Sequence, residues 1–310
     1  MSNRYSTAAA GAKIKKTAGD RVFDFINIAL LIAVLAVILY PLWLVVISSI
    51  SDAREVLAGH VVLYPIGLTL ESYKEIFGYA KLWTGYRNTI FYTVAGTCIS
   101  LIATMMAAYA TSRRFLGKGV VNFYFVFTMF FNGGLIPTFL TMRDLGLYNN
   151  IYIMIIAGAI SVWNLMIART YVSNSIPGEL YEAAMIDGAN HFQVFFQLVL
   201  PLSGTIIAVL TVYYGIQRWN DYFTGLIYLR DRNLLPLQTY LKEILASLQS
   251  SSNILDQMDS YSIQDSVEAL QRAEAAKYSI IVISTVPAVL LYVFMQKYFV
   301  KGVMIGSLKG

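Results

Sequence analysis

The chain has 310 residues, of which 57% are hydrophobic and only 13% are charged. A soluble domain is charged at about a quarter of its residues, so this composition excludes an ordinary soluble protein. The net charge of +5 is compatible with a nucleic-acid partner, but we expect none, because the positive charge has an explanation in membrane topology.

The apolar residues gather in blocks of about 20 residues, the length of a helix that crosses a bilayer. Blocks this long and continuous favour helices over barrel strands. After a basic N-terminal tail (1–21), the first apolar run exceeds the roughly 7–15 residues of a signal-peptide core, so we interpret it as an uncleaved anchor. We expect an all-α integral membrane protein whose transmembrane domain covers 22–300, with spans at about 22–50, 88–111, 120–140, 150–172, 200–225 and 278–299 and a C-terminal tail at 301–310.

An even number of spans places both termini on one side of the membrane. The short loop after the second span carries Arg113, Arg114 and Lys118 and no acid. Cytoplasmic loops are enriched in Lys and Arg, so we expect this loop and both termini in the cytoplasm. The segments 51–87 and 230–277 then form long outer loops, and the second contains an apolar stretch at partly helical spacing.

The third predicted span is interrupted by Asn132-Gly133-Gly134 and by Pro137. Freed backbone groups are tolerated in a bilayer only inside protein or beside a cavity. The interruption therefore predicts either a bend next to a transport pathway or close packing between helices.

The loop between the fourth and fifth spans, 173–201, has unusually consistent local signals. Pro177 suits the first turn of a helix, and Gly188 suits its left-handed end. Asn190 is a good N-cap for a second short helix, His191 to Val199. Pro201 then marks the beginning of the fifth span, so we predict two short helices joined by a glycine turn at the inner membrane surface.

In the first of these helices Leu180, Ala183, Ala184 and Asp187 share one face, which the two alanines make shallow. Glu182 lies beside that face. A helix that binds the lipid surface is usually rich in Lys and Arg, but the segment 173–201 has neither and carries three acids. A basic protein partner is therefore favoured over an anionic leaflet.

These residues resemble a known family. Glu182-Ala183-Ala184, followed by Gly188 and by Leu200-Pro201, resembles the EAA motif of binding-protein-dependent ABC importer permeases. The string from Glu182 to Ala189 is similar to the carbohydrate branch of that family, and the C-terminal tail is similar to that of the smaller maltose-importer permease. The stretch from Asn132 to Pro137 further resembles the subgroup that imports complex or uronate-containing oligosaccharides.

The resemblance implies a type I ABC importer permease with six transmembrane helices and cytoplasmic EAA coupling helices. It implies a multi-pass subunit in the cell membrane of a prokaryote. Its partners would be a second homologous permease, a cytoplasmic ATPase dimer and an extracytoplasmic solute-binding protein. Glu182 would pair with an arginine of the ATPase. The implied coupling residues are Glu182, Ala183, Ala184, Asp187, Gly188, Ala189 and Pro201, and the tail residues Gly306, Lys309 and Gly310 would enter the ATPase dimer interface.

Catalytic machinery is not expected in this chain. No Gly-x-x-x-x-Gly-Lys-Ser/Thr phosphate loop occurs, so ATP and Mg²⁺ would be bound by a separate ATPase and no cofactor by this chain. His60 and His191 are the only histidines, so we predict no metal site and no catalytic triad.

Polar residues inside spans are costly and often functional. Arg218 and Asp221 are three residues apart and could pair on one helix, with Trp219 in an interfacial aromatic belt. Alternatively the polar and aromatic residues contact sugar, whose hydroxyl groups need hydrogen-bond partners. The candidates for a substrate path are Asn132, Asn164, Trp219, Asn220 and Asp221.

Three alternatives remain beside a sugar permease. One is an ABC permease for a solute other than sugar. A second is a secondary transporter or channel, which would need intramembrane carboxylates that the centres of these spans lack. The third is a scaffold or receptor without transport.

Overall fold

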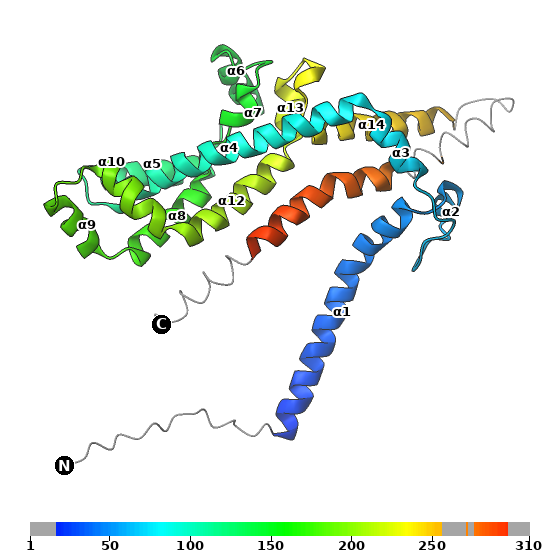
Figure 1. Cartoon of the computed structure of the whole chain (residues 1–310), viewed down its shortest axis with the longest axis horizontal. Helices are drawn as coiled ribbons and strands as arrows, with labels where there is room; N and C mark the ends of the chain where they lie inside the picture. Colours follow the sequence, from blue (N-terminus) through cyan, green and yellow to red (C-terminus); the bar gives the residue numbers. More distant parts are fainter. Residues whose placement is uncertain (1–16, 256–270, 272–275, 297–310) are drawn as a thin grey trace.

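The computed structural model describes residues 17–255, 271 and 276–296, and the described residues form helices without a strand. Figure 1 shows an elongated molecule in which several of the long helices run roughly along the longest axis. The long helices are α1 (Ala18–Ser49), α4 (Ala80–Ser112), α5 (Lys118–Phe130), α6 (Leu135–Asp144), α8 (Val162–Ser175), α12 (Gly204–Trp219) and α14 (Leu237–Leu255), together with the helix Ala276–Gln296. Shorter helices connect them: α2 (Ala53–Leu57), α3 (Glu71–Gly78), α7 (Tyr152–Ile156), α9 (Gly178–Ile186), α10 (His191–Gln193), the π-helix η1 (Val194–Val199), α11 (Leu200–Leu202), α13 (Phe223–Tyr228) and the 3-10 helix η2 (Arg232–Leu234).

Three of the described helices, α1, α4 and Ala276–Gln296, are long and apolar enough to cross a membrane, and the number rises to five if each of two bent helix pairs counts as one span. The structure therefore gives an all-helical protein with apolar membrane-length helices, and six spans stay a prediction. Helix α4 begins at Ala80, eight residues before the predicted boundary at 88.

The third predicted span is not continuous, because α5 and α6 are bent by 117° relative to each other. Gly134, at the break, has a φ of +87° and a ψ of 176°, a backbone conformation that is essentially restricted to glycine. Asn132 stabilises the turn, since its Oδ1 accepts a hydrogen bond from the backbone N–H of Gly134 at 2.9 Å. The structure shows the bend, and its place beside a transport pathway stays a prediction. A Cβ on Gly133 would meet only Pro137, at 3.7 Å.

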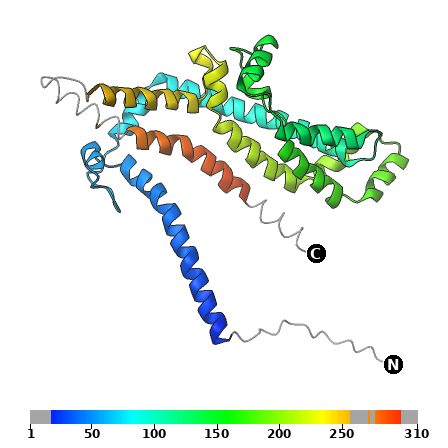
Figure 2. The same cartoon turned by 180° about the vertical axis from the view of Figure 1, so that it is seen from behind.

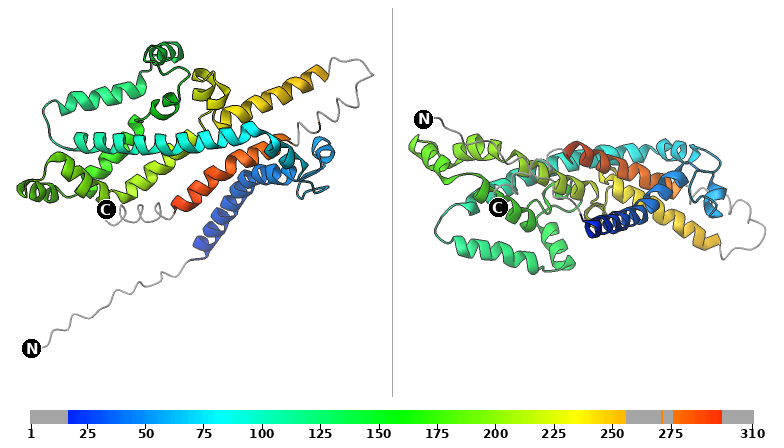
Figure 3. Two further views of the ribbon diagram at one scale, coloured as in Figure 1. Left: turned by 45° about the horizontal axis from the view of Figure 1, so that its top comes forward. Right: turned by 90° about the horizontal axis from the view of Figure 1, so that it is seen from below.

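Helix α4 lies at the centre of the bundle and packs against α7, α8 and α12. Its buried side chains form a core with residues of α8 and α12 and of the segment that follows α9. Figure 2, from behind, and Figure 3 show α4 and α12 side by side along the molecule. The core thus connects the centre of the bundle to the loop between the fourth and fifth predicted spans.

The fourth predicted span is also broken, between α7 and α8, and α12 satisfies backbone groups on both sides of the break. The Nη1 of Arg218 donates to the carbonyl oxygen of Met154 at 2.7 Å. One turn earlier, the hydroxyl of Tyr214 accepts a hydrogen bond from the backbone N–H of Ser161 at 3.1 Å and bonds Thr104 at 2.7 Å. Since lipid cannot satisfy backbone groups, these side chains make an interrupted span possible.

A similar arrangement occurs in the helix Ala276–Gln296, which contains Pro287. A proline has no N–H, so the carbonyl four residues earlier loses its helical partner. That carbonyl, of Ile283, accepts a hydrogen bond from the hydroxyl of Tyr86 at 2.9 Å. The indole N–H of Trp219 donates to the neighbouring carbonyl of Ser284 at 2.8 Å.

Helix α1 diverges from the bundle in Figures 1 and 3. Its buried residues are Ile47, Ser48 and Ser49, all in the last turn. Ser279 ties this turn to the last described helix by donating to the carbonyl of Ser49 at 3.2 Å. The rest of α1 presents its apolar side chains to the surroundings on all sides.

Candidate functional site

The segment after α8 has the helix–turn–helix form that its sequence predicts. Helix α9 begins at Gly178 directly after Pro177. Gly188 ends the turn with a φ of +82°, in the left-handed region. Asn190 then caps α10: its side chain accepts from the N–H of Gln193, whose own side chain accepts from the N–H of Asn190. The predicted positions of the glycine turn and of the cap are confirmed.

The second short helix is longer than predicted. It continues from α10 through the π-helix η1 into α11 and ends at Leu202, and α12 then leaves at an angle of 83° after Ser203. Pro201 therefore lies within α11, ahead of the bend, and does not begin the fifth span. Because Pro201 has no backbone N–H, it cannot donate a helical hydrogen bond to the preceding turn, which here is part of the π-helix η1.

Helix α9 has one fully buried side chain, that of Tyr181. Ala184 is half-buried and packs against the bundle core together with Ala189. Glu182, Ala183 and Asp187 are exposed. The structure thus directs Tyr181 and Ala184 toward the chain's own core, and the surface left for a partner consists of Ala183 with the two acids and the exposed side chains of Leu180, Met185 and Ile186.

The contact between α9 and the bundle was not found in the sequence. The rings of Tyr181 and Tyr109 stack with centroids 6.1 Å apart and an interplanar angle of 16°. The guanidinium carbon of Arg113 lies 3.1 Å from the centroid of the Tyr181 ring. The hydroxyl of Tyr109 also lies 3.2 Å from Nδ1 of His191. The sequence offered one signal, an aromatic residue on the inward face of a short helix, but not its partners.

The substrate-path candidates do not meet in one described cavity. Asn132 is exposed at the bend between α5 and α6, whereas Asn164 is buried near the start of α8. Trp219 borders a cavity of about 180 Å³ that is otherwise lined by Thr93 and apolar residues of α4 and of the last described helix, and neither Asn220 nor Asp221 lines it.

The hydrogen bonds of residues 218–221 correct one sequence-based interpretation, the pairing of Arg218 with Asp221. Arg218 donates to a backbone carbonyl and to Ser100 at 3.4 Å, and no ion pair joins it to Asp221, although both side chains are described. Asp221 instead accepts from the N–H of Thr224 at 3.0 Å. Trp219 is buried against the proline-containing helix, to which its indole N–H donates, and its position relative to the membrane interface stays a prediction. Carbonyl groups at interrupted helices therefore accept the hydrogen bonds that Arg218 and Trp219 donate.

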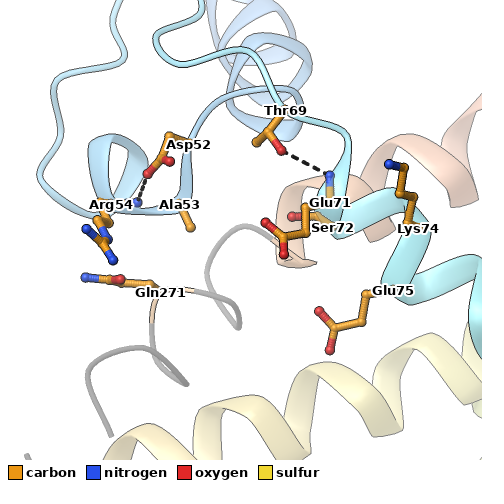
Figure 4. Close-up of a pocket in the computed structure, with 9 residues that line it drawn as sticks. All are labelled: Asp52, Ala53, Arg54, Thr69, Glu71, Ser72, Lys74, Glu75 and Gln271. Carbon is orange, nitrogen blue, oxygen red and sulfur yellow. Dashed lines mark hydrogen bonds between the residues drawn. The ribbon is translucent and has the colours of Figure 1, made fainter. Parts of the chain in front are cut away.

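The tail candidates Gly306, Lys309 and Gly310 lie outside the described residues. At the end of the molecule opposite α9, α2 and α3 border an open cavity of about 890 Å³. Figure 4 shows that its lining mixes acids and cations, among them Asp52, Arg54 and Glu71. Asp52 and Thr69 accept backbone hydrogen bonds from Arg54 and Glu71, so they are engaged in local turns.

Comparisons with known proteins agree with this architecture. Residues 99–305 match the family described as binding-protein-dependent transport system inner membrane component. The polygalacturonan/rhamnogalacturonan transport system permease protein YtcP of Bacillus subtilis is 34% identical over 94% of this chain and 99% of the relative. LplC of the same organism is 33% identical over 95% of this chain and 97% of its own length.

A solved structure described as a bacterial ABC transporter involved in the import of the acidic polysaccharide alginate also matches. The TM-score is 0.80 at 36% sequence identity, and the match covers 92% of this chain and 99% of the other. The chain therefore belongs to the family of inner membrane components of binding-protein-dependent transport systems, as an ABC importer permease.

Proposed function

We propose that this chain is a permease subunit that imports an acidic, uronate-containing oligosaccharide, driven by a separate ATPase that docks on α9. The observation that carries the coupling role is the exposed surface of α9. Glu182 and Ala183 are exposed beside the apolar side chains of Met185 and Ile186, on a helix whose opposite side is anchored by Tyr181. A shallow apolar surface next to an acid suits a basic protein partner.

Charge supports this assignment. The segment 173–201 has no Lys or Arg, and no ion pair involving Glu182 occurs within the described part of the chain. A carboxylate in this position is available to an arginine of another subunit, with which it can form a bidentate pair. In this proposal Asp187, Gly188, Ala189 and the helix that ends after Pro201 complete the docking surface.

The substrate class rests on the relatives. One relative is named for polygalacturonan and rhamnogalacturonan, and the solved structure is described as importing alginate. All three polymers contain acidic sugars, which favours a uronate oligosaccharide over a neutral one. The candidates for contact with it are Asn132, Asn164, Asn220 and Asp221, with Trp219 retained as a structural neighbour.

The proposed assembly contains a second homologous permease, an ATPase dimer that binds ATP and Mg²⁺, and an extracytoplasmic binding protein. The end of the molecule with α9 would face the cytoplasm, and so, by the distribution of Lys and Arg, would both chain termini. The opposite end, with α2, α3 and α14, would then meet the binding protein (Figure 1). The tail with Gly306, Lys309 and Gly310 would enter the ATPase dimer interface.

Charge reversal at α9 tests the coupling role. In the complete transporter reconstituted with its binding protein, Glu182→Arg should abolish ATP-dependent uptake by preventing docking of the ATPase. Glu179→Arg is the matched control, because Glu179 is an exposed acid on the same helix, in its first turn. Its reversal should cost a helix-dipole effect of about 0.3–1 kcal/mol, so uptake should stay within about fivefold. Unchanged uptake with Glu182→Arg would refute the coupling role.

The substrate class needs its own measurement. Calorimetry with the cognate binding protein should detect an oligogalacturonate or oligoalginate and no neutral oligosaccharide of the same length. Tight binding of the neutral sugar alone would overturn the uronate assignment. Uptake by the reconstituted chain without any ATPase would instead support a secondary transporter.

A further inference from the structure

The attachment of α9 to the bundle is concentrated in a small cluster of side chains around Tyr181. Tyr181 is 6% exposed and Tyr109 is 8% exposed. Tyr109 lies in the last turns of α4, and Arg113 is the residue that caps the end of this helix. Arg113 therefore connects the centre of the bundle to the short helix on which the proposed function depends.

The geometry makes the contact between Arg113 and Tyr181 a cation–π contact. The guanidinium carbon lies over the Tyr181 ring at 3.1 Å from the centroid and at 5.8 Å from the centroid of Tyr109. Both distances are within the roughly 6 Å over which a ring face attracts a cation. Nε of Arg113 donates to Ser112 at 3.3 Å, and no carboxylate forms an ion pair with Arg113 in the described ranges.

The hydroxyl of Tyr181 does not explain its burial. This oxygen is buried and has no hydrogen-bond partner among the described residues. Burial raises the pKa of Tyr181 and the nearby Arg113 only partly opposes this, so the phenol stays neutral. The aromatic face, and not a phenolate charge, is what Arg113 contacts.

The helices that follow the Gly188 turn also contact this cluster, through Tyr109. Phe195, in η1, has its ring centroid 5.9 Å from that of Tyr109. His191, in α10, approaches the Tyr109 hydroxyl at 3.2 Å. The end of α4 thus contacts the helices on both sides of the Gly188 turn, and a displacement of α9 and α10 reaches α4 through this cluster.

We propose that Arg113 is a positioning residue that, together with Tyr109, holds Tyr181 against the end of α4, so that α9 and the end of α4 move as one body. The inference rests on the coupling role of α9 proposed above. Helix α4 packs against α7, α8 and α12, so a rigid attachment at this point passes movement of the ATPase to the centre of the bundle. Without this contact, α9 could move with the ATPase while α4 kept its position.

The test is the amount of sugar imported per ATP hydrolysed by the complete reconstituted transporter with its binding protein. Arg113→Gln should leave the ATPase bound and its hydrolysis measurable, while the transport ratio falls several-fold. Arg113→Lys, which keeps the charge but loses the planar group, should fall in between. Arg114→Gln is the matched control, because it removes the same charge from an exposed neighbour, and it should keep the wild-type ratio.

A purely structural role would lower hydrolysis and uptake together and leave their ratio unchanged. That result for Arg113→Gln, or an equal fall for Arg114→Gln, would overturn the proposal. If the complex with Arg113→Gln does not assemble, two variants of Tyr181 provide the test. Tyr181→Phe should keep the ratio of sugar imported to ATP hydrolysed, and Tyr181→Leu should lower it. Equal ratios for these two variants would overturn the proposal. Failure of the coupling role itself would be visible separately, as normal uptake with Glu182→Arg.

Discussion

Replacement of Arg218 by methionine tests whether α12 holds the broken fourth span together. Methionine keeps most of the apolar stem but removes the donor that satisfies the carbonyl of Met154 at 2.7 Å and a weaker bond to Ser100 at 3.4 Å. A hydrogen bond to a charged group contributes about 1.5–3 kcal/mol, although bonds inside membranes average about 0.6 kcal/mol with a maximum near 1.7.

We expect Arg218→Met to cost about 2 kcal/mol, which lowers the folded-to-unfolded ratio roughly 30-fold, because the shorter bond is lost and a buried carbonyl is left without a donor. The measurement is denaturant-induced unfolding of the purified complex in detergent. The Arg218 side chain packs closely against Gly96, since a Cβ at this glycine would lie 3.0 Å from Nε of Arg218.

Asp221→Asn is the control that distinguishes an Arg218–Asp221 ion pair from a role of Arg218 in satisfying the broken fourth span. An asparagine can still accept from the N–H of Thr224, so the structure predicts a change within about 0.5 kcal/mol. If Asp221→Asn costs as much as Arg218→Met, the two residues form an ion pair and the reasoning from the broken span is wrong.

Three further substitutions address local structure, each measured by thermal unfolding of the complex. Gly188→Ala should cost about 1–2 kcal/mol, because a side chain is strained at a φ of +82°, whereas Gly178→Ala, in open space within α9, should be neutral or slightly stabilising; equal costs would contradict this. Asn190→Ala removes the capping box and should cost about 1 kcal/mol, and no loss would refute the role of the cap. Gly225→Ala should cost about 1–3 kcal/mol, because its Cβ would lie 2.8 Å from the ring of Pro236; a wild-type midpoint would contradict that packing.

The coupling segment could be predicted in detail because its signals are local. The glycine turn at Gly188 and the cap at Asn190 depend on residues within one or two helical turns. The bend at Asn132 is encoded in the same way, by an amide and two glycines in succession. In each case the sequence neighbours supply the hydrogen bonds or the backbone freedom that the turn requires.

The interruption between α7 and α8 could not be predicted from local sequence, because its hydrogen-bond partners are distant. Arg218 is 64 residues from Met154 in sequence, and Tyr214 is 53 residues from Ser161. The predicted pairing of Arg218 with Asp221 was wrong for the same reason. Helical spacing brings the two residues near each other, but Arg218 donates to the carbonyl of Met154 on another helix. Arg113 was interpreted only as a topological charge, because its aromatic partners lie on other helices.

The isolation of α1 has a consequence for the order in which the protein assembles. Its one described hydrogen bond to the last described helix joins Ser49 and Ser279, which are 230 residues apart. At a synthesis rate of about 5–20 residues per second, roughly 12–46 s separate the emergence of these two residues from the ribosome. During that interval the last turn of the first helix lacks this partner. The rest of its apolar surface is exposed in the finished chain as well, so lipid or another subunit must cover it both during and after synthesis.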